Sequence, residues 1–414
     1  MDSKLLPTIR RVLFCALPMS LFSAPMSLLP VAAAAQETFD IGVSTILSPP
    51  GSVVQGIQAR QALELMADWT NEQGGVLGRK IKLVIADDQG TTEGGRTVAE
   101  RLITRDKVSV ITGQVSSNVV LAALEVAKKY DVPLVNVNGW ASGIRTSGAR
   151  QVFSPGPYTT RVITATVDTL VGLGVKSVYA TFDNTDAGYS LQKELTEQMG
   201  VRAAAVDYKS VVLDRQAKDY LPVVLEIQSR QPDIVVSELI APAGYILMNQ
   251  LYDQGVAPTK ETAFFEMGGM TDNPDFWQNI RGAGKGTLAF GHYHPKFDLP
   301  GVGVAFRDRF AERYKAQPGR ISFQAADAFL VIMDAAKRAN STDSVPLIDA
   351  MEATDMVGTR GRITFDKTPG PTYHQWVDVP YAIYQITAID QKLEDTTLLK
   401  QANGPLDVKA IVAP

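Results

Sequence analysis

Short β-rich segments alternate with longer segments of helical periodicity along most of the chain. In residues 55–73, apolar side chains recur at three- and four-residue spacing, which predicts an amphipathic helix. Gly74 and Gly75 follow, as expected just past a helix end. The next segment, KIKLVIA at residues 80–86, is typical of a strand.

This alternation occurs in two successive runs. The first predicts strands at 38–45, 80–86, 108–112 and from 133, with helices at 55–73, 92–104 and 118–130. The second predicts helices at 159–173, 188–199, 217–229 and 244–254, with strands at 177–182, 203–208, 234–237 and 263–266. Helices at 306–314, 324–339 and 344–353 and strands at 361–365 and 379–389 follow, whereas 391–414 has no clear periodicity. We therefore predict an α/β fold with two doubly wound, parallel-sheet lobes.

The first 35 residues have the pattern of an export signal. Basic residues, including Arg10-Arg11, precede an apolar stretch at 12–31 that ends in Ala32–Ala35. We expect cleavage near Ala35, which leaves Gln36 first and places the protein in the periplasm. The alternative is a transmembrane anchor, but prolines interrupt the stretch and it falls short of the ~20 clean apolar residues that a spanning helix needs. The arginine pair hints at twin-arginine export, although ordinary secretion is the simpler interpretation.

Composition excludes several classes of protein. Cys15 is the only cysteine, and it lies in the predicted signal, so the exported chain would have no disulfide, thiolate nucleophile or cysteine-bound metal. The net charge of −4 becomes −6 without the first 35 residues. Mild acidity with interspersed signs indicates no nucleic-acid partner and a protein that is not membrane-embedded.

Polar loops follow several of the expected strands. In open parallel sheets, ligands bind beyond the carboxyl ends of the strands, where helix N-termini present unpaired N–H groups. Ser116-Ser117-Asn118 follows the strand that ends at Thr112 and begins a helix. A serine there either binds a ligand through its hydroxyl or only caps the helix.

Three later positions have the same character. Residues 138–142 (NGWAS) follow the fourth strand, and Trp140 either stacks on a ligand or packs inward. Residues 183–189 (DNTDAGY) follow a strand of the second run, and their acids either receive a cation or cap a helix. Glu266 ends the strand AFFE beside two glycines and is a candidate partner for an ammonium group, or an ordinary surface acid; Glu238 is a weaker case of the same kind.

At these residues the chain resembles a known family. Residues 71–83 (NEQGGVLGRKIKL), followed by Asp87-Asp88, resemble a signature of the type I periplasmic solute-binding proteins of ABC transporters, in the leucine/isoleucine/valine-binding branch. Residues 113–117 (GQVSS) and 132–135 (VPLV) resemble its next two elements, and the similarity of order extends from about 39 to 389.

The resemblance implies how the chain is divided into domains. It implies three crossings between lobes, which we place near Phe153–Pro155, Leu288–Gly291 and Phe365–Lys367. The expected domains are a signal peptide at 1–35, lobe 1 at 36–154 and 290–365, lobe 2 at 155–289 and 366–390, and a C-terminal tail at 391–414.

The resemblance also implies ligand roles. Ser117 matches the serine that holds a ligand carboxylate, and Glu266 is the nearest candidate for the acid that receives an α-ammonium. The implied ligand-binding residues are Ser116, Ser117, Asn138, Gly139, Trp140 and Ala141 in lobe 1, and Asp186, Ala187, Tyr189 and Glu266 in lobe 2. Either Trp140 or Asn138 stands where the family has a hydroxyl residue. Ala187 stands where it has an aromatic one, with Tyr189 two residues later. The ligand is therefore either an amino acid or an aromatic or other organic acid.

The implied function is capture of a small solute for an ABC transporter permease. An enzyme is the first rival, because His292 and His294 share one face of a strand and could begin a metal site. No third metal-ligating residue lies at a spacing typical of a metal site, and no hydrolase, zinc-protease or P-loop motif is present. We expect no catalytic residue, metal or cofactor. The second rival is a ligand sensor of the same fold that acts on a signalling partner.

Overall fold

A computed structural model describes residues 37–402 and 404–414. The expected signal peptide at 1–35 and Cys15 lie outside these residues. The first sheet has the order β2-β1-β3-β4-β5 and all its pairings are parallel. Its strands are β1 (Thr38–Thr45), β2 (Lys80–Asp87), β3 (Val110–Thr112), β4 (Leu134–Val135) and β5 (Val152–Phe153).

The second sheet has the order β14-β13-β10-β9-β8-β6-β7. The strands from β10 to β7 are parallel, whereas β13 pairs antiparallel with both β10 and β14. Its strands are β6 (Ser177–Asp183), β7 (Asp207–Leu213), β8 (Ile234–Ser237), β9 (Ala263–Glu266), β10 (Leu288–Gly291), β13 (Ala382–Gln385) and β14 (Thr397–Gln401). A separate hairpin joins β11 (Asp355–Val357) to β12 (Arg362–Thr364).

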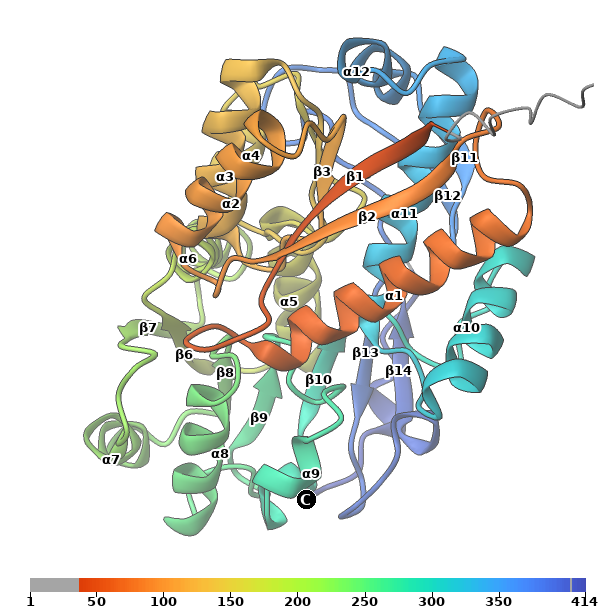
Figure 1. Ribbon diagram of the computed structural model, residues 1–414. Helices are drawn as coiled ribbons and strands as arrows, with labels where there is room; N and C mark the ends of the chain where they lie inside the picture. Colours follow the sequence, from red (N-terminus) through yellow and green to blue (C-terminus); the bar gives the residue numbers. More distant parts are fainter. Residues whose placement is uncertain (1–36, 403) are drawn as a thin grey trace, which may run out of the picture. The chain divides into compact units, whose positions relative to one another are not determined.

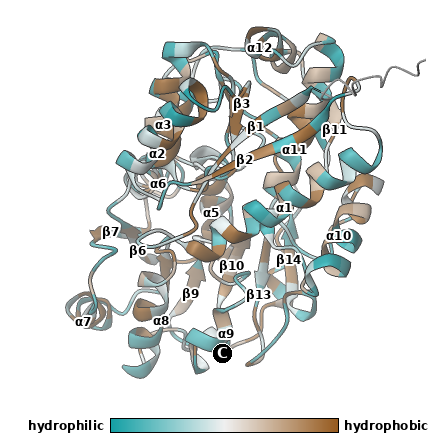
Figure 2. Ribbon diagram, in the orientation of Figure 1, coloured by the Kyte–Doolittle hydropathy of each residue, from teal (hydrophilic) through white to brown (hydrophobic). Residues whose placement is uncertain are grey.

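Helices cover both faces of each sheet, as the alternating pattern predicts. Around the first sheet lie α1 (Val53–Glu72), α2 (Thr92–Thr104), α3 (Ser117–Tyr130), α4 (Gly143–Thr146), α10 (Gly301–Tyr314), α11 (Arg320–Ala339) and α12 (Ser344–Glu352). Around the second lie α5 (Thr159–Leu173), α6 (Asp186–Arg202), α7 (Leu221–Arg230), α8 (Ala243–Asp253) and α9 (Phe276–Asn279). Figure 1 shows α11 beside α1, although the two are far apart in sequence. Hydrophobic residues are concentrated on strands such as β9 and β10, while α8 and α10 are mixed (Figure 2).

The chain passes between the two sheets three times. It leaves the first sheet after β5, returns after β10 when α10 to α12 pack against the first sheet, and ends in the second sheet with β13 and β14. The second crossing, expected near Leu288–Gly291, follows β10, which covers those residues and pairs with β9 and β13. The segment 391–414, expected as a C-terminal tail, contains β14, which hydrogen-bonds to β13 and extends the second sheet.

Other boundaries differ for local reasons. The strand expected at 203–208 is found at β7, because α6 continues to Arg202 and delays it. The helix expected from Ala217 begins at Leu221, next to a proline suited to the first helical turn. Residues 186–189, expected in a loop, form the first turn of α6, where Thr185 caps the helix by accepting a hydrogen bond from the N–H of Gly188.

Candidate functional site

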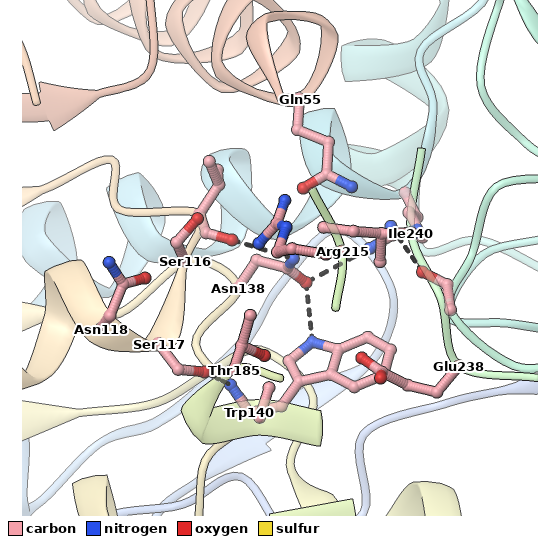
Figure 3. A pocket seen from close by; sticks show the side chains of 14 residues that line it. Gln55, Ser116, Ser117, Asn118, Asn138, Trp140, Thr185, Arg215, Glu238 and Ile240 are labelled. Carbon is pink, nitrogen blue, oxygen red and sulfur yellow. Dashed lines mark hydrogen bonds between the residues drawn. The ribbon is translucent and has the colours of Figure 1, made fainter. Parts of the chain in front are cut away.

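The carboxyl ends of strands from both sheets meet at one cavity. Its volume in this structure is about 50 Å³, which is below the usual range of small-molecule sites. Figure 3 shows Gln55 at one end of the cavity in this view, with Trp140 and Glu238 at the other. The cavity is lined by Gln55, Val115, Ser116, Ser117, Asn118, Asn138, Trp140, Thr185, Ala187, Arg215, Glu238, Ile240, Gly268 and Arg320.

The structure brings half of the predicted site residues to this cavity. Ser116, Ser117, Asn138, Trp140 and Ala187 line it. The remaining five do not: Asp186 and Tyr189 line an adjoining groove, Gly139 and Ala141 lie in the loop behind Trp140, and Glu266 is fully buried. That all ten bind the ligand stays a prediction.

The loop after β4 is held from within the protein. Ser117 Oγ accepts hydrogen bonds from the backbone N–H groups of Trp140 and Ala141, at 3.0 and 3.1 Å. The N–H of Gly139 donates to Asn136 Oδ1, and that of Asn138 donates to the carbonyl of Gln114. The backbone donors expected to hold a ligand carboxylate are therefore engaged in this structure, and a ligand would have to replace or share their acceptors.

Trp140 is held rigidly at the cavity wall. Its indole Nε1–H donates to Asn138 Oδ1 at 2.9 Å, and its ring meets the edge of His292 with 5.5 Å between centroids. Its backbone carbonyl accepts from both the hydroxyl and the N–H of Thr159, the first residue of α5. The side chain is 5% exposed. Trp140 is thus packed inward and also presents part of its ring to the cavity.

Three buried acids end neighbouring strands of the second sheet. Asp183 ends β6, Glu238 follows β8 and Glu266 ends β9. Burial raises the pKa of Asp183, raises that of Glu238 well above its usual range and raises that of Glu266 to about 7. Glu238 Oε2 accepts from the N–H of Asp183, and Glu266 Oε1 has no partner among the described residues. Of the three, only Glu238 lines the cavity, so the weaker sequence candidate has the better position.

Arg320 joins the two lobes beside the cavity. It is the first residue of α11, and its guanidinium lies 3.3 Å from Asp272 in the loop after β9. It also donates to the carbonyls of Gly268 and Gly269 and to Asn138 Oδ1. Both side chains of the ion pair are almost completely buried. The hydrogen-bonding capacity of Arg320 is largely used by the protein itself.

Sequence reasoning missed three polar residues that line the cavity. Gln55 lies in the first turn of α1, and the loop before that helix follows β1, so its position was open to prediction. Arg215 follows β7, which was expected several residues earlier. Arg320 reaches the cavity only because the chain returns to the first sheet with α11, and no local pattern indicates that.

The two candidate metal-binding histidines are buried for structural reasons. His294 Nε2 lies 2.9 Å from Thr396 Oγ1, and the ring of His292 packs between Trp140 and Phe290. Burial lowers the pKa of His294 to about 4. Within residues 37–402 and 404–414, no group of three or more potential ligands could hold a metal ion. In the same residues, no helix has the length and apolar character required to cross a bilayer.

Known proteins resemble this chain in sequence and in fold. The Leu/Ile/Val-binding protein BraC3 of Rhizobium johnstonii is 26% identical over 254 residues, which are 60% of this chain and 66% of that protein. The comparison thus spans just under two thirds of that relative. The leucine-binding protein LivK of Thermotoga maritima has a TM-score of 0.78 at 21% identity, over 88% of this chain and 99% of that one. A solute-binding protein of an ABC transporter from R. palustris, in complex with benzoate, has a TM-score of 0.76 at 21% identity, over 90% and 99%.

The family is shown by a match over most of the chain. Residues 38–391 match the family described as periplasmic binding protein. This range contains both sheets down to β13 and every residue that lines the cavity. Members of this family bind ligands outside the cytoplasm and are not enzymes. The chain belongs to the periplasmic binding protein family.

Proposed function

We propose that this chain is the periplasmic substrate-binding component of an ABC transporter and captures a small carboxylate-bearing solute by cleft closure. One observation carries the proposal: a single cavity is lined by residues that follow strands of both sheets. The solute is a branched-chain or other amino acid, or an aromatic or other organic acid. One relative named as a leucine-binding protein and another solved in complex with benzoate support this range.

Contacts between the two lobes support closure as the mechanism. Arg320 bridges to Asp272, and the N–H of Ser142 donates to Ser190 Oγ at 3.4 Å. A solute that contacts both walls favours the closed form by its higher affinity for that form. In this proposal, the closed form is what a membrane permease recognises. The signal peptide near 1–35, the periplasmic location and the lobe boundaries at 154/155 and 365/366 belong to the same proposal.

A thermal-shift screen of the purified protein tests the proposal. The panel contains leucine, isoleucine, phenylalanine, benzoate, 4-hydroxybenzoate and succinate, with glucose as a control that carries no carboxylate. A solute that binds only the folded state raises the melting temperature, by an amount that grows with its concentration relative to Kd. We expect at least one carboxylate to do so and glucose to have no effect. A panel in which only glucose stabilises the protein would contradict the proposed solute class.

Transport itself needs a separate measurement. Deletion of the gene should abolish uptake of the radiolabelled solute that stabilises the protein, and the intact gene should restore it. Normal uptake in the deletion strain, together with loss of a transcriptional response to the same solute, would favour a ligand sensor.

A further inference from the structure

Two arginines line the cavity, and their surroundings differ. Arg320 is 2% exposed and has Asp272 and three backbone or amide oxygens around its guanidinium. The side chain of Arg215 is 21% exposed, and its single close partner is Asp183 at 4.0 Å. Within the described residues, its guanidinium makes no hydrogen bond. Five N–H donors in a planar fork are therefore available at this wall of the cavity.

The loop that carries Arg215 is fixed although its guanidinium is not. The backbone N–H of Arg215 donates to Asn184 Oδ1 at 3.1 Å. Next to it, the N–H of Gln216 donates to Asp214 Oδ1, and the hydroxyl of Tyr220 donates to the carbonyl of Asp214. The protein thus holds the arginine at the cavity without using its donors.

Ser116 is in the same situation on the first lobe. It stands at the N-cap of α3, and its hydroxyl makes no capping hydrogen bond. Ser116 and Arg215 both line the cavity, and both also line the adjoining groove, so they lie where the two hollows meet. The cavity walls also include the apolar side chains of Val115, Trp140 and Ile240.

We propose that Arg215 and Ser116 together bind the carboxylate of the ligand, whose apolar part extends toward Trp140, and that Arg215 selects acids without an α-ammonium group over amino acids. The inference rests on the proposed function, because it names the solute class for the same cavity. It moves the carboxylate away from the loop of residues 138–141, whose N–H groups are engaged by Ser117 Oγ, Asn136 and Gln114.

Charge explains the selectivity. The α-ammonium of an amino acid lies one carbon from the carboxylate, so a carboxylate held by Arg215 brings a second positive charge toward the guanidinium. Two like charges repel each other more strongly in a cavity that excludes water. Glu238, the acid that lines the cavity, and Asp183, the partner of Arg215, could offset this repulsion, but burial raises the pKa of both carboxyls and so favours their neutral forms. An acid without an ammonium group gains the ion pair with no such cost.

Matched solutes and matched variants test the inference by calorimetric titration. The pairs are 4-methylpentanoate with leucine, and 3-phenylpropanoate with phenylalanine, which differ only by the ammonium group. The variants are Arg215→Gln and Arg281→Gln; Arg281 is an exposed arginine of the second lobe, paired with Asp253. Each variant is first checked for an unchanged melting temperature without ligand.

The native protein should bind one acid at least about tenfold more tightly than its amino-acid partner. Arg215→Gln should lower the affinity for that acid at least about tenfold, and Arg215→Lys should restore part of it. Arg281→Gln should leave the affinity unchanged. Tighter binding of the amino acids, or unchanged affinity in Arg215→Gln, overturns the inference and leaves the proposed function standing. If no carboxylate binds the native protein, the proposed function fails and this inference fails with it.

Discussion

The hydroxyl oxygen of Ser117 accepts a hydrogen bond from the backbone N–H of Trp140 at 3.0 Å, which fixes the loop after β4 to the start of α3. The neighbouring N–H of Ala141 donates to the same oxygen. One buried side chain therefore holds two backbone donors of the cavity wall. This structural role is compatible with the ligand contact that the sequence predicts, because the hydroxyl proton stays available for donation.

Replacement of Ser117 by alanine should destabilise the protein. The N–H groups of Trp140 and Ala141 would lose their acceptor inside a buried loop, which costs about 1–3 kcal/mol. Urea unfolding measures the change. Ser229→Ala, at an exposed position of α7, is the control and should stay within about 0.5 kcal/mol of the native protein. Equal stability of the two variants would mean that the Ser117 hydrogen bonds contribute nothing.

The buried pair of Arg320 and Asp272 should be far more important than a surface pair. Asp272→Asn leaves a buried guanidinium without its counter-charge, and breaking such a pair typically costs about 3–5 kcal/mol. The matched control is Asp68→Asn, which breaks the exposed pair with Arg313 and should cost about 1 kcal/mol or less. Chemical unfolding of both variants distinguishes these values. A loss for Asp272→Asn no larger than for the control would show that the lobes do not rely on this bridge.

Trp140 should report ligand binding by fluorescence. The chain has four tryptophans, and Trp140 is the one in the cavity wall. A carboxylate that binds should change the emission of the native protein, and Trp140→Phe should remove most of that change. Trp277→Phe, whose indole donates to the carbonyl of Gln391 away from the cavity, should keep it. A full signal in Trp140→Phe would place the ligand elsewhere.

Glu266 should make stability fall as the pH rises. Burial raises its pKa from an ordinary value of 4.5 to about 7, so between these values the folded state keeps a proton that the unfolded state has released. Stability is therefore lost from about pH 4.5 to about pH 7, by roughly 3 kcal/mol, and the loss levels off above. Glu266→Gln, which stays neutral, should gain stability over the native protein along that range.

The pH experiment has its own control. Glu261→Gln, at an exposed position before β9, should follow the native protein at every pH. Urea unfolding at pH 4.5, 6 and 8 gives the three curves. A constant difference between Glu266→Gln and the native protein would show that Glu266 titrates near its ordinary pKa.

Much of the architecture was readable from the alternation of apolar runs. The helix before Gly74-Gly75, the helix that begins just after Ser116 and the loop that contains Asn138 follow from local periodicity and turn residues, and the structure has them. Elements whose position depends on the chain crossing back between the sheets could not be predicted from the sequence. The strand β14 has no strong pattern and is defined by its pairing with β13. Arg320 enters the site from a helix about 200 residues after Ser116, and only tertiary packing brings the two together.

The charged contacts of the second lobe were the hardest to predict. Glu266 ends its strand as expected but is fully buried and does not line the cavity, whereas Glu238, one residue beyond the neighbouring strand, lines it. A shift of one position along a strand reverses the direction of a side chain, so a register uncertain by one residue cannot choose between such acids.

A crystal structure of the protein with its tightest-binding carboxylate tests the central claim most directly. We predict one solute enclosed between the lobes, within hydrogen-bonding distance of residues that follow strands of both sheets, with Trp140 against its apolar part. A solute bound to one lobe alone, or outside the cavity lined by Ser116, Trp140 and Arg215, would contradict the claim.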